Sequence, residues 1–81
     1  MPLNSYESFR QAIEAKWLAG QHSGNVAAER LYERVLFRLV GRSGEALAHL
    51  TELTQGTRDP EVRAWYAAIA GELAALPELA G

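Results

Sequence analysis

The chain contains no cysteine, which excludes disulfide bonds and thiolate metal sites. It also lacks any run approaching the roughly 18 uninterrupted apolar residues that span a bilayer. The first segment, MPLNSYESFRQ, has no charged region followed by an apolar run, so we expect no signal peptide. Together these absences lead us to expect a cytoplasmic protein with no membrane span.

Length and charge are modest as well. The chain has 81 residues, enough for one domain, and its formal net charge at pH 7 is -2. This acidic balance gives no basic footprint of the kind that nonspecific nucleic-acid binding requires. A chain this short buries only roughly 60% of its unfolded surface, and small domains often gain stability from a partner subunit.

Apolar residues recur at helical spacing in four segments, and no segment alternates as a β-strand does. The four expected helices cover about 5–19, 26–40, 44–54 and 60–76, and residues 77–81 are expected to form a frayed tail. Because the connections between these segments are short, the sequence predicts a single all-α domain. The expected architecture is a four-helix antiparallel array of the hairpin or bundle type.

Capping residues and glycines define the expected helix ends. The strongest start signal is Asp59 followed by Pro60. The other expected N-caps are Asn4, which has capping-box spacing to Glu7, then Asn25 or Ser23, and Ser43. We expect the four helices to stop at Gly20, Gly41, Gly56 and Pro77.

The second helix has apolar residues outside its predicted core face. At 100° per residue, Phe37 lies roughly opposite the core positions Val35 and Leu39, and Val26 and Val40 share its flank. Chance exposure is the alternative, since single exposed apolar residues are common. Three apolar side chains on one flank favour burial against a second layer or another chain.

The fourth helix repeats this pattern with small residues along its back: Ala64, Ala67, Ala68, Gly71 and Ala75. Small side chains allow another helix to approach closely, although alanine is also the best helix former and fills surface positions readily. We expect self-association, most simply as a two-fold dimer through the second and fourth helices, or docking on another protein. The expected interface residues are Phe37, Val40, Ala64, Ala68 and Gly71.

Arginine recurs every fourth residue at Arg30, Arg34, Arg38 and Arg42. One interpretation is a solvated face with ion pairs such as Arg30–Glu33, each contributing little. The functional interpretation is an interface rim or an anion-binding ridge. Guanidinium groups suit this role because they form bidentate hydrogen bonds with carboxylate or phosphate. A carboxylate-bearing protein surface is the preferred partner, and nucleic acid is the alternative.

The second half of the chain partly matches two helical motifs. Residues 50–66 have roughly the spacing of a helix-turn-helix, but a start of Asp59, Pro60 and Glu61 faces phosphates with negative charge. The stretch GEALAHLTEL…DPEVRAWYAAIAGEL resembles tetratricopeptide-like helical hairpins through Ala46, Leu50, Leu53, Pro60 and Trp65. That resemblance covers about half the chain and implies antiparallel helix hairpins used for protein binding.

Catalytic and metal-binding signatures are missing from the sequence. His22 and His49 are isolated, without the companion ligands that a metal site needs. The glycines punctuate helices and form no phosphate-binding loop, and no serine has a nucleophile elbow around it. We therefore expect no enzyme, no cofactor and no small-molecule substrate.

Overall fold

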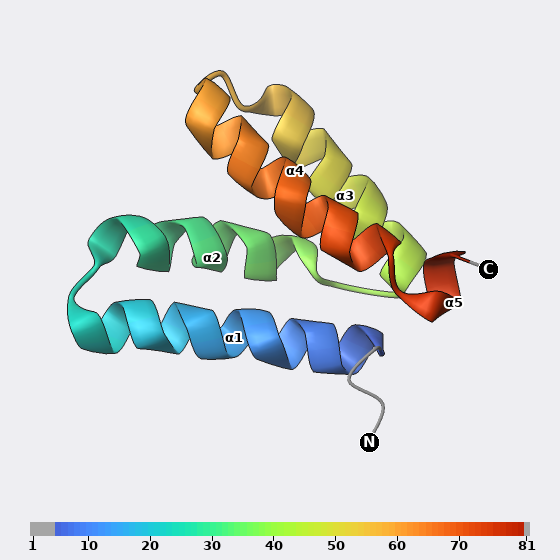
Figure 1. Ribbon diagram of the computed structural model, residues 1–81, viewed down its shortest axis with the longest axis horizontal. Helices are drawn as coiled ribbons and strands as arrows, with labels where there is room; N and C mark the ends of the chain where they lie inside the picture. The colour runs from blue at the N-terminus through green and yellow to red at the C-terminus, as the bar shows by residue number, and fades with distance from the viewer. Residues whose placement is uncertain (1–4, 81) are drawn as a thin grey trace.

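The fold is all-α, as the periodicity predicts. The computed structural model describes residues 5–80, except for the side chains at positions 78 and 80. Its helices are α1 (Tyr6–Ser23), α2 (Val26–Arg38), α3 (Ser43–Gly56), α4 (Pro60–Ala74) and the short α5 (Pro77–Ala80). Two antiparallel hairpins, α1 with α2 and α3 with α4, converge near the α2–α3 connection and diverge toward their turns (Figure 1).

The first helix is longer than predicted, because Gly20 does not end it. The helix runs on to Ser23, and Gly24 ends it in the left-handed conformation with a φ of 74°. Gly20 is instead buried where α2 begins: a Cβ atom placed there would lie 3.1 Å from the backbone nitrogen of Glu29. The expected cap Asn4 lies outside the described residues, and Ser5 caps α1 by accepting the N–H of Ser8 at 3.1 Å.

The second helix begins as predicted and ends early. The Asn25 side chain accepts the backbone N–H of Ala28 at 3.1 Å, which confirms Asn25 as the N-cap. The helix stops at Arg38, two residues before the predicted end, since Leu39 already leaves the helical conformation with a ψ of 60°. Gly41 lies in the following connection with a positive φ of 75° and not at the helix end.

The third helix begins one residue earlier than expected, so the predicted N-cap Ser43 is wrong. Ser43 is already helical and Arg42 is the cap residue, whose backbone N–H donates to Glu45 Oε1 at 3.2 Å. The helix also includes Gly56, its last residue, and Thr57 is its C-cap. The Thr57 hydroxyl donates to the carbonyl of Leu53 at 2.7 Å and satisfies one of the terminal carbonyls.

The fourth helix confirms its predicted start and corrects its predicted end. Asp59 accepts the N–H groups of Glu61 and Val62 at 2.9 and 3.3 Å, and Pro60 follows it at the first helical position. The helix ends at Ala74 and not at residue 76. Residues 77–80 then form α5 where a frayed tail was expected, because Leu76 and Leu79 pack against the core.

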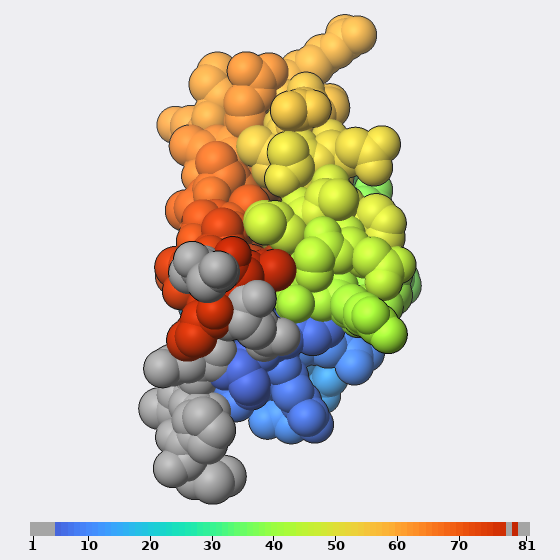
Figure 2. All heavy atoms as spheres, turned by 90° about the vertical axis from the view of Figure 1, so that its right-hand side faces the viewer, coloured from blue at the N-terminus to red at the C-terminus, as the bar shows by residue number. Residues whose placement is uncertain are grey.

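The hydrophobic core lies at the end where the two hairpins converge. Seen from that side, α5 lies beside the first turn of α3, with the start of α1 below them (Figure 2). Where the hairpins spread apart, the rings of Tyr32 and Trp65 meet with centroids 4.7 Å apart and join α2 to α4. The buried core residues are Phe9, Ile13, Val35, Leu39, Ala46, Leu50, Tyr66, Ile69, Leu73 and Leu76.

Candidate functional site

The outer face of α2 carries large apolar side chains that the fold does not cover. Phe37 is 66% exposed, Val26 is 53% exposed, and Val40, just beyond the helix, is 52% exposed. On the opposite side of the same helix Val35 is completely buried. The structure thus places Phe37 and Val40 at the surface, which is the position an interface residue requires.

The back of α4 is an exposed stripe of small residues. Glu61 and Glu72 flank this stripe on one side and Arg63 flanks it on the other, and all three are exposed. A Cβ atom built on Gly71 would meet nothing within 4 Å, so the fold itself does not require glycine there. The exposed residues of the stripe are Ala64, Ala67, Ala68, Gly71 and Ala75.

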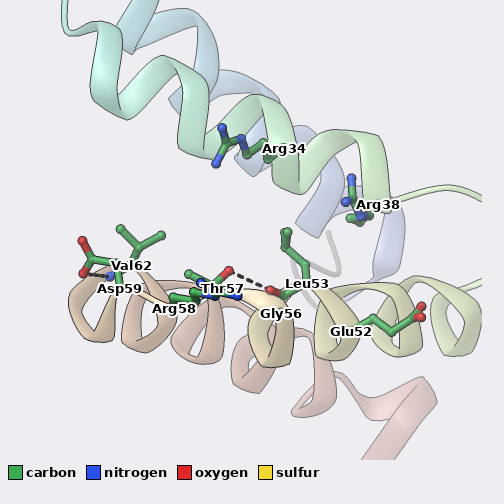
Figure 3. Close-up of a pocket in the computed structure, with 9 residues that line it drawn as sticks. All are labelled: Arg34, Arg38, Glu52, Leu53, Gly56, Thr57, Arg58, Asp59 and Val62. Atoms are coloured by element: carbon green, nitrogen blue, oxygen red, sulfur yellow. Dashed lines mark hydrogen bonds between the residues drawn. The ribbon is translucent and has the colours of Figure 1, made fainter.

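The four arginines of the predicted ridge do not share one surface. Arg34 and Arg38 line a cleft between α2 and the diverging end of the α3–α4 hairpin (Figure 3). Arg30 lies on the exposed outer side of α2, seven residues and therefore about two turns before Phe37. Arg42 sits at the start of α3. The ridge is split because α2 ends at Arg38 and the second hairpin tilts away from α2.

The cleft combines an apolar lining with charged groups and has a volume of about 680 Å³. The side chain of Leu53 projects from α3 toward α2, where Arg34 and Arg38 lie (Figure 3). Arg58, from the connection between α3 and α4, adds a third guanidinium. The full lining consists of Arg34, Arg38, Glu52, Leu53, Gly56, Thr57, Arg58, Asp59 and Val62.

Among the described residues, the arginines near these surfaces have no acidic partner. In the part of the protein that the structure describes, no carboxylate oxygen lies within 4.0 Å of Arg30, Arg34 or Arg38. The ion pair Arg30–Glu33, expected for a solvated face, is therefore not formed. Asp59 in the cleft is occupied by the cap of α4, so its negative charge is directed at backbone N–H groups.

The two histidines and Tyr32 are titratable side chains that lie outside the lining of the cleft. Within residues 5–80, no group of three His, Asp or Glu side chains is placed to hold a metal ion. His49 lies with Nδ1 3.4 Å from the carbonyl of Arg38, and His22 is exposed near the end of α1. Burial raises the pKa of the Tyr32 phenol above 10.0, and the negative charge of Glu72 raises it further.

The cleft is the feature that sequence patterns did not reveal. Arg58 precedes the Asp59–Pro60 helix start, and nothing in its local sequence pairs it with α2. The cleft depends on the angle between the two hairpins, which is a property of tertiary packing. The Tyr32–Trp65 contact is of the same kind, since it joins α2 to α4, which are far apart in the sequence.

Comparison with known proteins adds no relative. No protein family, curated protein or solved structure matches this chain.

The helices α3 and α4 lie side by side and antiparallel across a three-residue connection, residues 57–59 (Figure 1). A helix-turn-helix instead crosses at about 90–120°. This packing therefore does not favour the helix-turn-helix interpretation, and antiparallel hairpins alone do not identify a family. None of the helices in the described region is long and apolar enough to cross a membrane.

Proposed function

We propose that this chain is a small, non-enzymatic protein–protein interaction module of the cytoplasm. It associates through the apolar outer faces of α2 and α4, most simply as a homodimer. The observation that carries the proposal is Phe37, a large aromatic residue that stays 66% exposed at the surface of a small domain. A cytoplasmic location rests on the absence of cysteine.

The distribution of apolar residues supports this function. A compact helical domain needs one apolar face per helix to build its core. Here the core closes with Val35 of α2, with Leu39 just after that helix, and with Tyr66, Ile69 and Leu73 of α4. The apolar residues on the backs of both helices are additional to that core. Their burial in an interface stabilises association by roughly 25 cal/mol per Å² of apolar surface removed from water.

The test replaces one exposed residue and leaves the core intact. Phe37→Glu is expected to keep helicity and thermal stability while lowering association, measured by light scattering on a size-exclusion column. Leu18→Glu is the matched control, because Leu18 is also a large apolar residue at the surface, 38% exposed, but lies on α1. If both variants associate like the native chain, Phe37 is not an interface residue. If Phe37→Glu loses its fold, the residue supports the monomer core.

The cleft gives a second candidate function, the binding of anionic groups. The specific observation is that Arg34, Arg38 and Arg58 line one cleft, and the first two have no carboxylate partner in the described chain. Guanidinium groups in this setting suit the carboxylates of a protein surface or, as the alternative, the phosphates of a nucleic acid. Of these two, the acidic net charge of the chain favours a protein.

Retention on heparin tests anion binding. Arg34→Ala combined with Arg38→Ala should reduce retention and its dependence on salt, since each phosphate-like contact contributes to the salt slope. Arg10→Ala combined with Lys16→Ala removes the same charge from the exposed face of α1 and is the matched control. Equal effects of the two pairs would show that net charge, and not the cleft, governs retention. Absence of binding at any salt concentration would end this candidate.

A further inference from the structure

We propose that the outer face of α2 binds α2 of a second copy of the chain, with the two helices antiparallel about a two-fold axis. The inference rests on the proposed function and deepens it, because it names the partner, the direction and the register of one of the two faces. It is carried by a self-complementary arrangement of exposed residues along α2.

The exposed residues of this face follow the spacing of a helix–helix seam. Val26, Arg30, Glu33 and Phe37 are separated by four, three and four residues along α2, and the exposed Val40 lies just beyond the end of that helix. Alternating steps of three and four keep side chains on one side of a helix and are the repeat of packed helix pairs. All five residues are exposed, so this side of α2 is free to accept a partner.

The order of these residues makes the face complementary to itself. Val26 and Phe37 lie at equal distances on either side of the midpoint between Leu31 and Tyr32, and so do Arg30 and Glu33. A two-fold axis through that midpoint places Val26 opposite the partner's Phe37 and Arg30 opposite the partner's Glu33. The same two contacts recur on the other side of the axis, as an isologous interface requires.

Charge decides between the two possible directions. In a parallel pair, Arg30 would face the partner's Arg30 and Glu33 would face the partner's Glu33, which sets like charges together. The antiparallel pair converts both contacts into attractions. Neither Arg30 nor Glu33 has an opposite charge within 4.0 Å in the described chain, so both groups are available to the second copy.

Charge exchange tests the register. Arg30→Glu and Glu33→Arg, each alone, should weaken the dimer at least about tenfold, because each creates two like-charge contacts per dimer. The double variant should regain most of the native affinity, and an equimolar mixture of the two single variants should form a mixed dimer. Arg10→Glu on α1 is the control for net charge and should leave association unchanged. Single variants that dimerise like the native chain, or a double variant as weak as the singles, would overturn the register.

Cross-linking tests the direction, and the absence of native cysteine makes it unambiguous. A mixture of Val26→Cys and Phe37→Cys variants should oxidise mainly to the mixed disulfide, because position 26 of one copy lies opposite position 37 of the other. A parallel seam would instead give the two homodisulfides. Two further outcomes separate this inference from the proposed function. A mixture of these variants that stays dimeric by light scattering but forms none of these cross-links overturns the α2 seam and leaves association to α4, whereas a native monomer at every concentration overturns both.

Discussion

Two glycines inside helices are expected to respond in opposite ways to the same substitution. Gly20 lies in α1 and Gly71 in α4, and both are helical. A Cβ atom at Gly20 would lie 3.1 Å from the backbone nitrogen of Glu29 and 3.4 Å from its Cα atom. A Cβ atom at Gly71 would meet nothing within 4 Å. Alanine therefore fits at position 71, whereas at position 20 the backbone of α2 must move by a few tenths of an ångström to admit it.

The expected change in the free energy of unfolding is the sum of two contributions. Replacing glycine by alanine within a helix stabilises by about 0.5–1 kcal/mol, and both variants share this gain. At Gly20 the methyl group must also displace backbone that is held in place. Asn25 donates to the carbonyl of Gly20 at 2.9 Å, and Glu29 donates to the carbonyl of Asn25 at 3.0 Å. Overpacking of this kind costs about 1–3 kcal/mol, so Gly20→Ala should be destabilised by up to about 2.5 kcal/mol.

Thermal unfolding followed by circular dichroism measures both effects. In a domain of this size about 1 kcal/mol shifts the Tm by roughly 4–8 °C, so the two variants should move in opposite directions by several degrees. The protein concentration must be low, because association would add its own concentration-dependent stabilisation. A Gly20→Ala variant as stable as Gly71→Ala would refute the close approach of α1 and α2. At higher concentration, Gly71→Ala should weaken association where a partner helix packs on the α4 stripe.

Two further predictions concern the buried Tyr66 and the partly buried Tyr32. Tyr66→Phe should leave the free energy of unfolding unchanged or raise it by up to about 1 kcal/mol, because the buried Tyr66 hydroxyl has no hydrogen-bond partner among the described residues. A clear loss of stability in urea unfolding would instead reveal a hydrogen bond that the fold requires. The raised pKa of Tyr32 means that the folded state favours the neutral phenol, so its contribution to stability is complete below about pH 10 and is lost as the pH rises through the folded pKa. Glu72→Gln should lower the pKa of Tyr32, seen by ultraviolet titration of tyrosinate against the Tyr32→Phe variant, while an unchanged titration would contradict the proximity of Glu72.

Local signals in the sequence predicted much of the fold. The start of α4 was predictable because Asp59 and Pro60 act within their own turn, where few other forces compete. The core faces followed from periodicity, which places Val35 and Leu39 inside and Phe37 outside. These features depend on residues that are close along the chain, so they can be predicted from the local sequence.

The mistakes came from contacts between distant segments. Gly20 looks like a helix stop, yet α1 continues past it, and a Cβ atom at this position would lie only 3.1 Å from the backbone of α2. The tail after Pro77 forms α5 because Leu76 and Leu79 reach the core. The arginine ridge divides between a cleft and an outer face because the hairpins diverge, and no spacing of arginines within α2 encodes that angle.

The exposed apolar outer faces of α2 and α4 are proposed to bind a second copy of the chain. Light scattering on a size-exclusion column across a range of concentrations tests this proposal most directly. We expect a mass twice the 8.9 kDa of the chain, falling to the monomer value for Phe37→Glu at the same concentration. A native mass of 8.9 kDa at every concentration would contradict self-association.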